Sequence, residues 1–358
     1  MSDVNTIVER PSNYYKDMQL KMGKAHRLLS VQWELTYRCN EKCTHCYLDV
    51  MPPSANVPGE LTTTEAKKVI DDLARLGGLT ITFSGGEIFV RKDIFEIASY
   101  ARQKGFAIRF FTNGILIKPE VADKIAAVKP VVVEFSVYGI NAETHDGITQ
   151  VPGSYDLTMR AINLLLKRGV RCIMKTPIMK ENITQIDAMA QQAKDLGIHF
   201  QYDLTIVPKH TGDVSPLKHR PSDDQMLEFL QRRVTPDSWT LYNMGDTHRF
   251  CGIGLSSLTI SPYGEIYTCV GARVSAGNIR TTPLNEIWHD SPVWEETSSF
   301  TLSNLPVCST CELKQFCIRC HGTAAFEDGD MLGCSSVAYR EARLRRQAYK
   351  SNMLGGNI

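Results

Sequence analysis

The sequence predicts an α/β fold: a partial (β/α)6 TIM-like barrel followed by a small C-terminal domain that is held together by metal. Two observations predict it. Short β-branched runs alternate with amphipathic helical patterns through most of the chain, as in βα units around a parallel sheet. The chain also has 11 cysteines, and all but one fall into a group near its start or a group near its end. A loop-rich segment with many cysteines typically needs metal to fold.

Each expected strand is a short apolar run, and each run is followed by a helical pattern. The strands are 31–37, 79–85, 107–113, 131–139, 171–178 and 199–206. In the clearest helix Ala66, Val69, Ile70, Leu73 and Ala74 form one apolar stripe before Gly77 and Gly78. Further helices are expected at 92–104, 118–128, 155–168, 184–196 and 222–233. Since six units are too few for a closed (β/α)8 barrel, we expect an open one with its site at the carboxyl ends of the strands.

The change from βα rhythm to a cysteine-rich tail divides the chain. We expect an N-terminal extension (1–30), the barrel (31–235), the small domain (236–345) and a C-terminal tail (346–358).

Composition and charge exclude several partners. The chain has 40 basic and 39 acidic residues and a net charge of +1, so it carries no overall electrostatic footprint for nucleic acid. Its N-terminal segment has no apolar region of the kind that a signal peptide needs, and no apolar run approaches the roughly 20 residues of a membrane span. We therefore expect a cytoplasmic protein without a nucleic-acid or membrane partner. In that reducing compartment the cysteines should bind metal rather than form disulfides.

Three cysteines, Cys39, Cys43 and Cys46, follow the first expected strand in "CNEKCTHCYLD". A zinc ion usually takes four ligands, and no fourth is evident nearby. Three thiolates suit a cluster of four irons in which one iron stays open for a substrate or cofactor. A zinc site that lacks its fourth ligand is the alternative.

This motif resembles that of the radical S-adenosylmethionine (SAM) enzymes, which carry C-x3-C-x-aromatic-C after the first strand. Here His45 stands where an aromatic ring is usual. The resemblance implies a [4Fe–4S] cluster on Cys39, Cys43 and Cys46 that binds SAM through its open iron. Reductive cleavage of SAM would give a 5′-deoxyadenosyl radical, which removes hydrogen from the substrate.

Two further segments agree with the resemblance. In "SGGE" (84–87), Gly85 and Gly86 let a backbone approach closely and Glu87 can face an ammonium group. In the family this motif binds the amino group of SAM; Ile88 replaces the proline that often follows. Ser136 resembles the position that contacts the ribose. Taken alone, the glycines could form a plain turn and Ser136 could simply face outward.

The C-terminal cysteines resemble a SPASM domain, which holds auxiliary iron–sulfur clusters. Gly264 would form the turn of its hairpin in "ISPYGEIYTC" (260–269). The resemblance implies an outer cluster on Cys308, Cys311, Cys317 and Cys334, and an inner one on Cys251, Cys269 and Cys320. The spacing Cys317-x2-Cys320 is one residue shorter than usual. The inner cluster therefore lacks a fourth thiol: it could be open to substrate, be of a smaller type, or take another ligand. His248 and His321 are candidates for that ligand, although a lone His beside a cluster more often packs or donates a hydrogen bond. Cys172 is expected to be an inert buried thiol.

The resemblance implies an enzyme that modifies a peptide or protein side chain by crosslinking, epimerisation or oxidation. A flavodoxin or ferredoxin would supply electrons, and a separate protein or the barrel surface would recognise a leader peptide. One alternative is a tetrapyrrole-modifying relative, whose cavity should hold several Arg or Lys residues; the run "LKHR" (217–220) is a candidate. The other is a non-catalytic iron–sulfur or zinc protein that does not cleave SAM. No acid or base is singled out by the sequence.

Overall fold

The computed structural model describes residues 13–241 and 244–355. Within them one sheet of nine strands forms the frame, in the order β6-β5-β4-β3-β2-β1-β7-β8-β9. The six predicted strands are present and parallel to their neighbours. They are β1 (Ser30–Thr36), β2 (Thr80–Gly85), β3 (Ala107–Thr112), β4 (Val132–Ser136), β5 (Cys172–Pro177) and β6 (His199–Asp203). The predicted fold class is confirmed.

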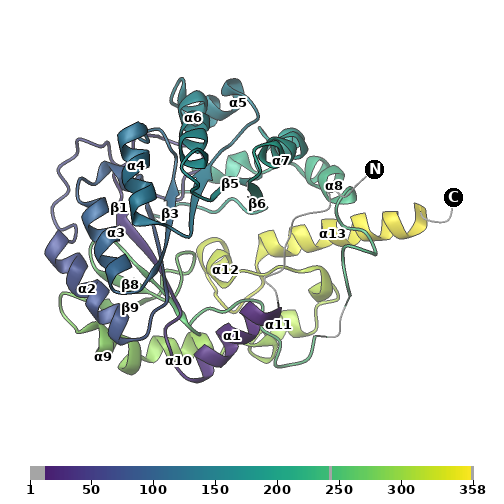
Figure 1. Ribbon diagram of the computed structural model, residues 1–358. Coiled ribbons are helices and arrows are strands. Elements are labelled where there is room, and N and C mark those ends of the chain that lie inside the picture. The colour runs from purple at the N-terminus through teal and green to yellow at the C-terminus, as the bar shows by residue number, and fades with distance from the viewer. Residues whose placement is uncertain (1–12, 242–243, 356–358) are drawn as a thin grey trace.

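Helices cover the outer face of these strands (Figure 1). The predicted ones are α2 (Thr63–Arg75), α3 (Ile94–Gln103), α4 (Pro119–Val128), α6 (Ser154–Leu166), α7 (Ile186–Asp195) and α8 (Asp223–Gln231). α2 begins at a capping box between Thr62 and Glu65. Its predicted apolar stripe packs against the strands in one core that also contains the rings of Trp33, Phe83 and Phe110.

Several elements were not predicted. Among them are two helices, α1 (Asn13–Lys24) and α5 (Ala142–Thr149). Short 3-10 helices lie at Ile88–Val90, Ile183–Gln185, Ser215–His219, Leu302–Asn304 and Lys314–Phe316. α5 starts where the Asn141 side chain caps the Thr144 amide at 3.0 Å.

The C-terminal third continues the sheet. β7 (Ser257–Ile260) pairs in parallel with β1, and β8 (Glu265–Tyr267) and β9 (Ser275–Asn278) follow as antiparallel strands. The predicted hairpin is present between β7 and β8, and Gly264 lies at its turn with φ +85°. The pairing of β7 with β1 was not predicted, because sequence patterns do not report which distant strands meet.

The remaining helices lie beyond the hairpin. They are α9 (Leu284–Asp290), α10 (Pro292–Ser298), α11 (Pro306–Ser309), α12 (His321–Asp328) and α13 (Ser336–Gly355). α13 runs without a break through residues 345 and 346 and packs against α8 (Figure 1). In the described part of the chain, no helix is both long and apolar enough to cross a membrane.

Candidate functional site

The loop that carries Cys39, Cys43 and Cys46 is anchored by backbone hydrogen bonds on two sides. The Cys39 amide donates to the Met51 carbonyl at 2.8 Å, where the loop returns. The Thr44 amide donates to the Ile148 carbonyl at 2.9 Å, at the end of α5. The unpredicted helix α5 therefore holds the middle of the cysteine loop in place.

The three thiols lie in the loop that follows β1, close enough for Cys39 and Cys46 to act on Cys43 electrostatically. That they hold a cluster stays a prediction. Burial raises the pKa of Cys43 well above its usual value, and Glu41, Cys46 and Cys39 all add to the rise. The Cys43 thiol donates to the Glu41 carboxylate at 3.2 Å. Binding to iron would remove this burial cost, because the thiolate charge would then be compensated by the metal.

His45 behaves as the aromatic ring whose place it takes. Its ring meets Tyr138 edge-on, with centroids 4.6 Å apart. Burial lowers the pKa of His45 to about 3, so the imidazole is neutral near pH 7. The substitution therefore keeps a flat, uncharged ring beside the thiols.

Gly85 and Gly86 allow two segments of the protein's own backbone to meet. The Gly86 amide donates to the Thr36 carbonyl at 2.7 Å, and the Glu87 amide to the Arg38 carbonyl at 2.9 Å. A Cβ atom on Gly85 would lie 2.4 Å from the Thr36 oxygen, and one on Gly86 would lie 2.3 Å from the Arg38 oxygen. The glycines thus extend the pairing of β2 with the chain that leads directly to Cys39.

Glu87 is buried, and its hydrogen bonds join the end of β2 to the end of β3. Its carboxylate accepts hydrogen bonds from the Phe89 amide at 3.0 Å, the Thr112 hydroxyl at 2.9 Å and the Asn113 amide at 2.8 Å. Burial raises the pKa of Glu87 to about 7. The structure turns this carboxylate toward β3 and its following residues, so a contact between the Glu87 side chain and SAM stays a prediction.

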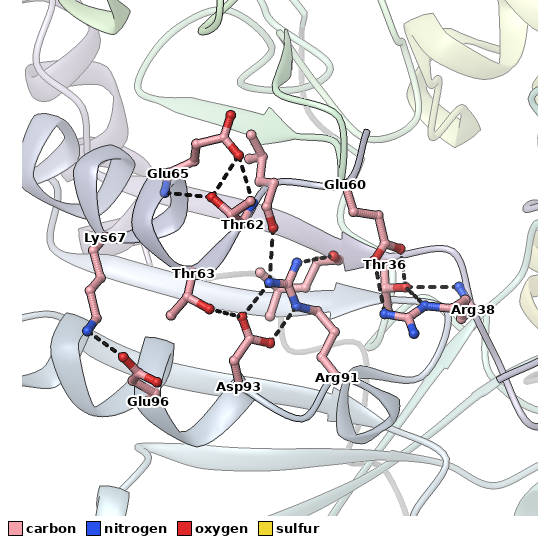
Figure 2. A network of polar contacts seen from close by, with 12 residues as sticks. Thr36, Arg38, Glu60, Thr62, Thr63, Glu65, Lys67, Arg91, Asp93 and Glu96 are labelled. Atoms are coloured by element: carbon pink, nitrogen blue, oxygen red, sulfur yellow. Dashed lines mark hydrogen bonds and ion pairs between the residues drawn. The ribbon is translucent and has the colours of Figure 1, made fainter. Parts of the chain in front are cut away.

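A second polar network fastens the carboxyl end of β1 to its surroundings (Figure 2). The Arg91 guanidinium donates to the carbonyls of Leu35 at 3.0 Å and Leu61 at 3.1 Å, and it pairs with Asp93 at 2.6 Å. Nearby, Arg38 pairs with Glu60 at 2.9 Å. These bonds hold the end of β1 and the residues between it and Cys39 in place.

Arg91→Ala is expected to lower the free energy of unfolding by about 2–4 kcal/mol, because it leaves buried carbonyls without donors and Asp93 without its partner. Chemical denaturation of the reconstituted protein would measure the loss. Arg75→Ala is the control, since Arg75 is 70% exposed and pairs with Asp72 at the surface. Equal small effects of both variants would contradict this role of Arg91.

A cavity of about 1260 Å³ opens between β5, β6 and the C-terminal third of the chain. Ser136 lines it, as do His45 and Tyr138 from the side of the cysteine loop. Cys269 and Cys320, two of the three expected inner ligands, line the same cavity. The structure therefore places Ser136 and the inner thiols around one space.

The inner face of the strands carries charged residues that were not predicted as part of the site. Glu134 on β4 pairs with Arg109 on β3 and with Lys175 on β5, whose Nζ lies 2.5 Å from the carboxylate. Glu34 on β1 accepts from Arg273 at 2.7 Å, which ties β1 to the turn between β8 and β9. The sequence does contain a pattern that could have indicated these charges, because each of these strands has one charged residue within an apolar run.

The outer four cysteines surround a cavity of their own. Cys308, Cys311, Cys317 and Cys334 all line a space of about 310 Å³. Within residues 13–241 and 244–355, no three Cys, His, Asp or Glu side chains are close enough together to hold a single metal ion. In an iron–sulfur cluster each ligand sulfur binds a different iron, and the assignment of these four cysteines to an outer cluster stays a prediction.

The inner cysteines also approach one another. Burial raises the pKa of Cys251 to about 11, and the charges of Cys269 and Cys320 contribute to that rise. His321 is buried, and its Nδ1 lies 2.7 Å from an Arg319 nitrogen. The His248 ring packs against Phe250, with centroids 5.2 Å apart. Which group completes the inner cluster stays a prediction.

Two other expectations have clear outcomes. Cys172 is buried on β5 at 4% exposure, as expected of an inert thiol.

No residue of the "LKHR" run lines the cavity: His219 contacts Glu181 at 2.7 Å, and Arg220 pairs with Glu327 at 2.5 Å. This run is therefore not the basic cavity wall that a tetrapyrrole substrate would need.

Comparison with known proteins agrees with the geometry. The chain matches the Radical SAM superfamily over residues 33–193 and the iron-sulfur cluster-binding domain SPASM over residues 251–312. The AdoMet-dependent heme synthase of Methanosarcina barkeri is 32% identical over 341 residues, 87% of this chain and 96% of that protein. The mycofactocin maturase MftC of Mycobacterium tuberculosis is 31% identical over 285 residues, 75% of this chain and 72% of that protein. Streptococcus suis SuiB, solved with its precursor peptide SuiA, has a TM-score of 0.68 at 16% identity; the match covers 94% of this chain and 84% of that chain.

Proposed function

Because this chain belongs to the radical SAM superfamily and carries a SPASM domain, we propose that it modifies a side chain of an extended peptide segment. As a member it is an enzyme whose cofactors are SAM, a [4Fe–4S] cluster and auxiliary iron–sulfur clusters. SAM and the cluster supply a 5′-deoxyadenosyl radical. The protein binds the substrate, orients it and excludes water.

The observation that carries the proposal is the free edge of β6 along the cavity wall. β6 ends the sheet on its side, and every residue from His199 to Asp203 lines the cavity. The Asp203 carbonyl accepts from the Ile178 amide at 2.7 Å, so strand alternation turns the backbone groups of Phe200 and Tyr202 away from β5. An extended peptide can pair with such groups and place alternate side chains in the cavity.

The cavity also provides a group for proton transfer. The Asp203 side chain is open to the cavity, and the Thr205 amide donates to its carboxylate at 2.9 Å. Desolvation by the surrounding protein raises the pKa of Asp203. A carboxyl with a raised pKa is suited to accept a proton from a reacting side chain and return it. We assign Asp203 this role within the proposal.

The assignment of residues follows the same geometry. Cys39, Cys43 and Cys46 would hold the SAM cluster, Gly85 and Gly86 would shape its loop, and Ser136 would contact the cofactor. The reacting side chain would lie between Ser136 and the wall that contains Cys269 and Cys320. A flavodoxin or ferredoxin as reductant, and a separate protein that recognises a leader peptide, complete the proposal.

The proposal is tested with peptides encoded by short reading frames beside the gene. The reconstituted, reduced enzyme is expected to change the mass of one such peptide in step with 5′-deoxyadenosine formation. Hydrogen exchange at 199–203 is expected to slow when that peptide binds, because the free edge of β6 becomes paired. A peptide that is modified without any slowing at β6 would contradict the binding mode.

One observation favours a tetrapyrrole as a second candidate substrate. Lys175, Lys194 and Arg319 line the cavity, and Asp203 is the one carboxylate in its lining. Lys175 is already paired with Glu134, so Lys194 and Arg319 are the cations that suit a substrate with several carboxylates. The 32% identity to a heme synthase over 96% of its length points the same way. An iron-bound tetrapyrrole with several carboxylates, offered in the same assay, separates the two candidates. A change in its mass, with hydrogen exchange at β6 unchanged, would replace the peptide proposal.

A further inference from the structure

Arg319 is a buried cation between the two groups of C-terminal thiols. It lies in the short spacing between Cys317 and Cys320, and its side chain is 3% exposed. It lines the large cavity together with Cys269 and Cys320. It also lines the smaller cavity that the four outer cysteines surround. Arg319 therefore lies beside both groups of expected ligands.

The hydrogen bonds of Arg319 leave its charge uncompensated. One terminal nitrogen lies 2.7 Å from His321 Nδ1, and the other donates to the carbonyls of Met331 at 2.6 Å and Gly333 at 2.7 Å. Its Nε is buried without a partner. In the described part of the chain no carboxylate forms an ion pair with it. Burying a guanidinium without an anion costs free energy, so a negative charge bound beside Arg319 would stabilise the folded protein.

The thiols of both groups can supply that charge. Cys308 and Cys317 of the outer group line the smaller cavity together with Arg319. Cys269 and Cys320 of the inner group line the larger cavity with it. Iron-bound cysteines are thiolates, so two loaded clusters would surround Arg319 with negative charge.

We propose that Arg319 is a shared electrostatic partner of both auxiliary clusters and raises the reduction potential of each. Reduction adds one electron to a cluster and no proton, which makes the cluster more negative. A fixed positive charge stabilises that reduced form more than the oxidised form, and low dielectric strengthens the effect. The inference rests on the proposed division of the thiols between two clusters.

The test measures midpoint potentials rather than turnover. Arg319→Gln is made in a Cys39/Cys43/Cys46→Ala background, so that only the auxiliary clusters respond. Iron is counted first, with about eight atoms expected, or about six if the inner cluster has two irons. In a redox titration followed by electron paramagnetic resonance, both potentials are expected to become more negative. Unchanged potentials at full iron content, or a shift in one cluster alone, would overturn the shared role.

The double variant Glu341→Gln/Arg345→Gln is the matched control. Arg345 is also buried and donates to the Phe316 carbonyl, next to Cys317, at 3.2 Å, but it pairs with Glu341 at 2.7 Å. Removing this pair changes no net charge, so the potentials are expected to move much less than in Arg319→Gln. An equal shift in the control would overturn the electrostatic explanation.

Arg319→Lys separates charge from architecture if the Gln variant loses iron. Lys keeps the charge but cannot hold the Met331 and Gly333 carbonyls together in the same way. Retained iron and potentials near those of the parent would support the proposal; loss of iron equal to that in Arg319→Gln would overturn it. A parent protein without auxiliary iron would instead refute the thiol assignment, and the inference would fall with it.

Discussion

Replacing Cys39, Cys43 and Cys46 together by Ala is expected to abolish 5′-deoxyadenosine formation in the reduced, reconstituted enzyme. The reason is that the three thiols lie together at the end of β1 and are the proposed ligands of the SAM cluster. Iron should fall by about four atoms while the auxiliary clusters remain. Mass spectrometry of the nucleoside and a count of iron and sulfide measure both effects.

Cys172→Ala is the matched control for this triple variant. Cys172 is buried on β5, and its thiol contacts the Val170 carbonyl at 3.5 Å rather than another cysteine. The control is expected to keep full iron and full SAM cleavage, at a cost of about 1 kcal/mol in stability. Cleavage by the triple variant at the parent rate would contradict the assignment.

Gly86→Ala is expected to have the second-largest effect, a fall in the rate of SAM cleavage of roughly 100-fold. A Cβ atom there would lie 2.3 Å from the Arg38 oxygen and 2.8 Å from its carbonyl carbon. These are backbone atoms, so they cannot swing aside as a side chain would. The chain before Cys39 must move, and the thiol at its end moves with it.

Gly147→Ala tests whether that effect is specific. Gly147 lies on α5, the helix that anchors the cysteine loop, and a Cβ there meets nothing within 4 Å. Ala is the better helix former, so this variant is expected to be neutral or slightly more stable. The rate of 5′-deoxyadenosine formation and the iron content are measured in both variants. Similar losses in both would show that the steric argument at Gly86 is wrong.

Much of the candidate site could be proposed from the sequence because its residues lie in short segments with recognisable spacing. The cysteine spacing at 39–46 and the glycines at 85–86 each act over a few residues, and β1 and β2 were equally visible as apolar runs. The role of Glu87 could not be seen in this way. Its carboxylate is surrounded by groups from β3, and no pattern near residue 87 reports them.

The sequence by itself determined the βα order, the cysteine groups and the family. The reason is that the spacing of apolar residues, the turn residues and the spacing of the cysteines are local properties of a chain. Only the tertiary structure decided that β7 pairs with β1, that Glu34 meets Arg273, and that Arg319 lies between two groups of thiols. It also decided that the free edge of β6 faces the cavity. The physical reason is that these contacts join residues distant in sequence, and their energy comes from burial and charge that exist only once the segments meet.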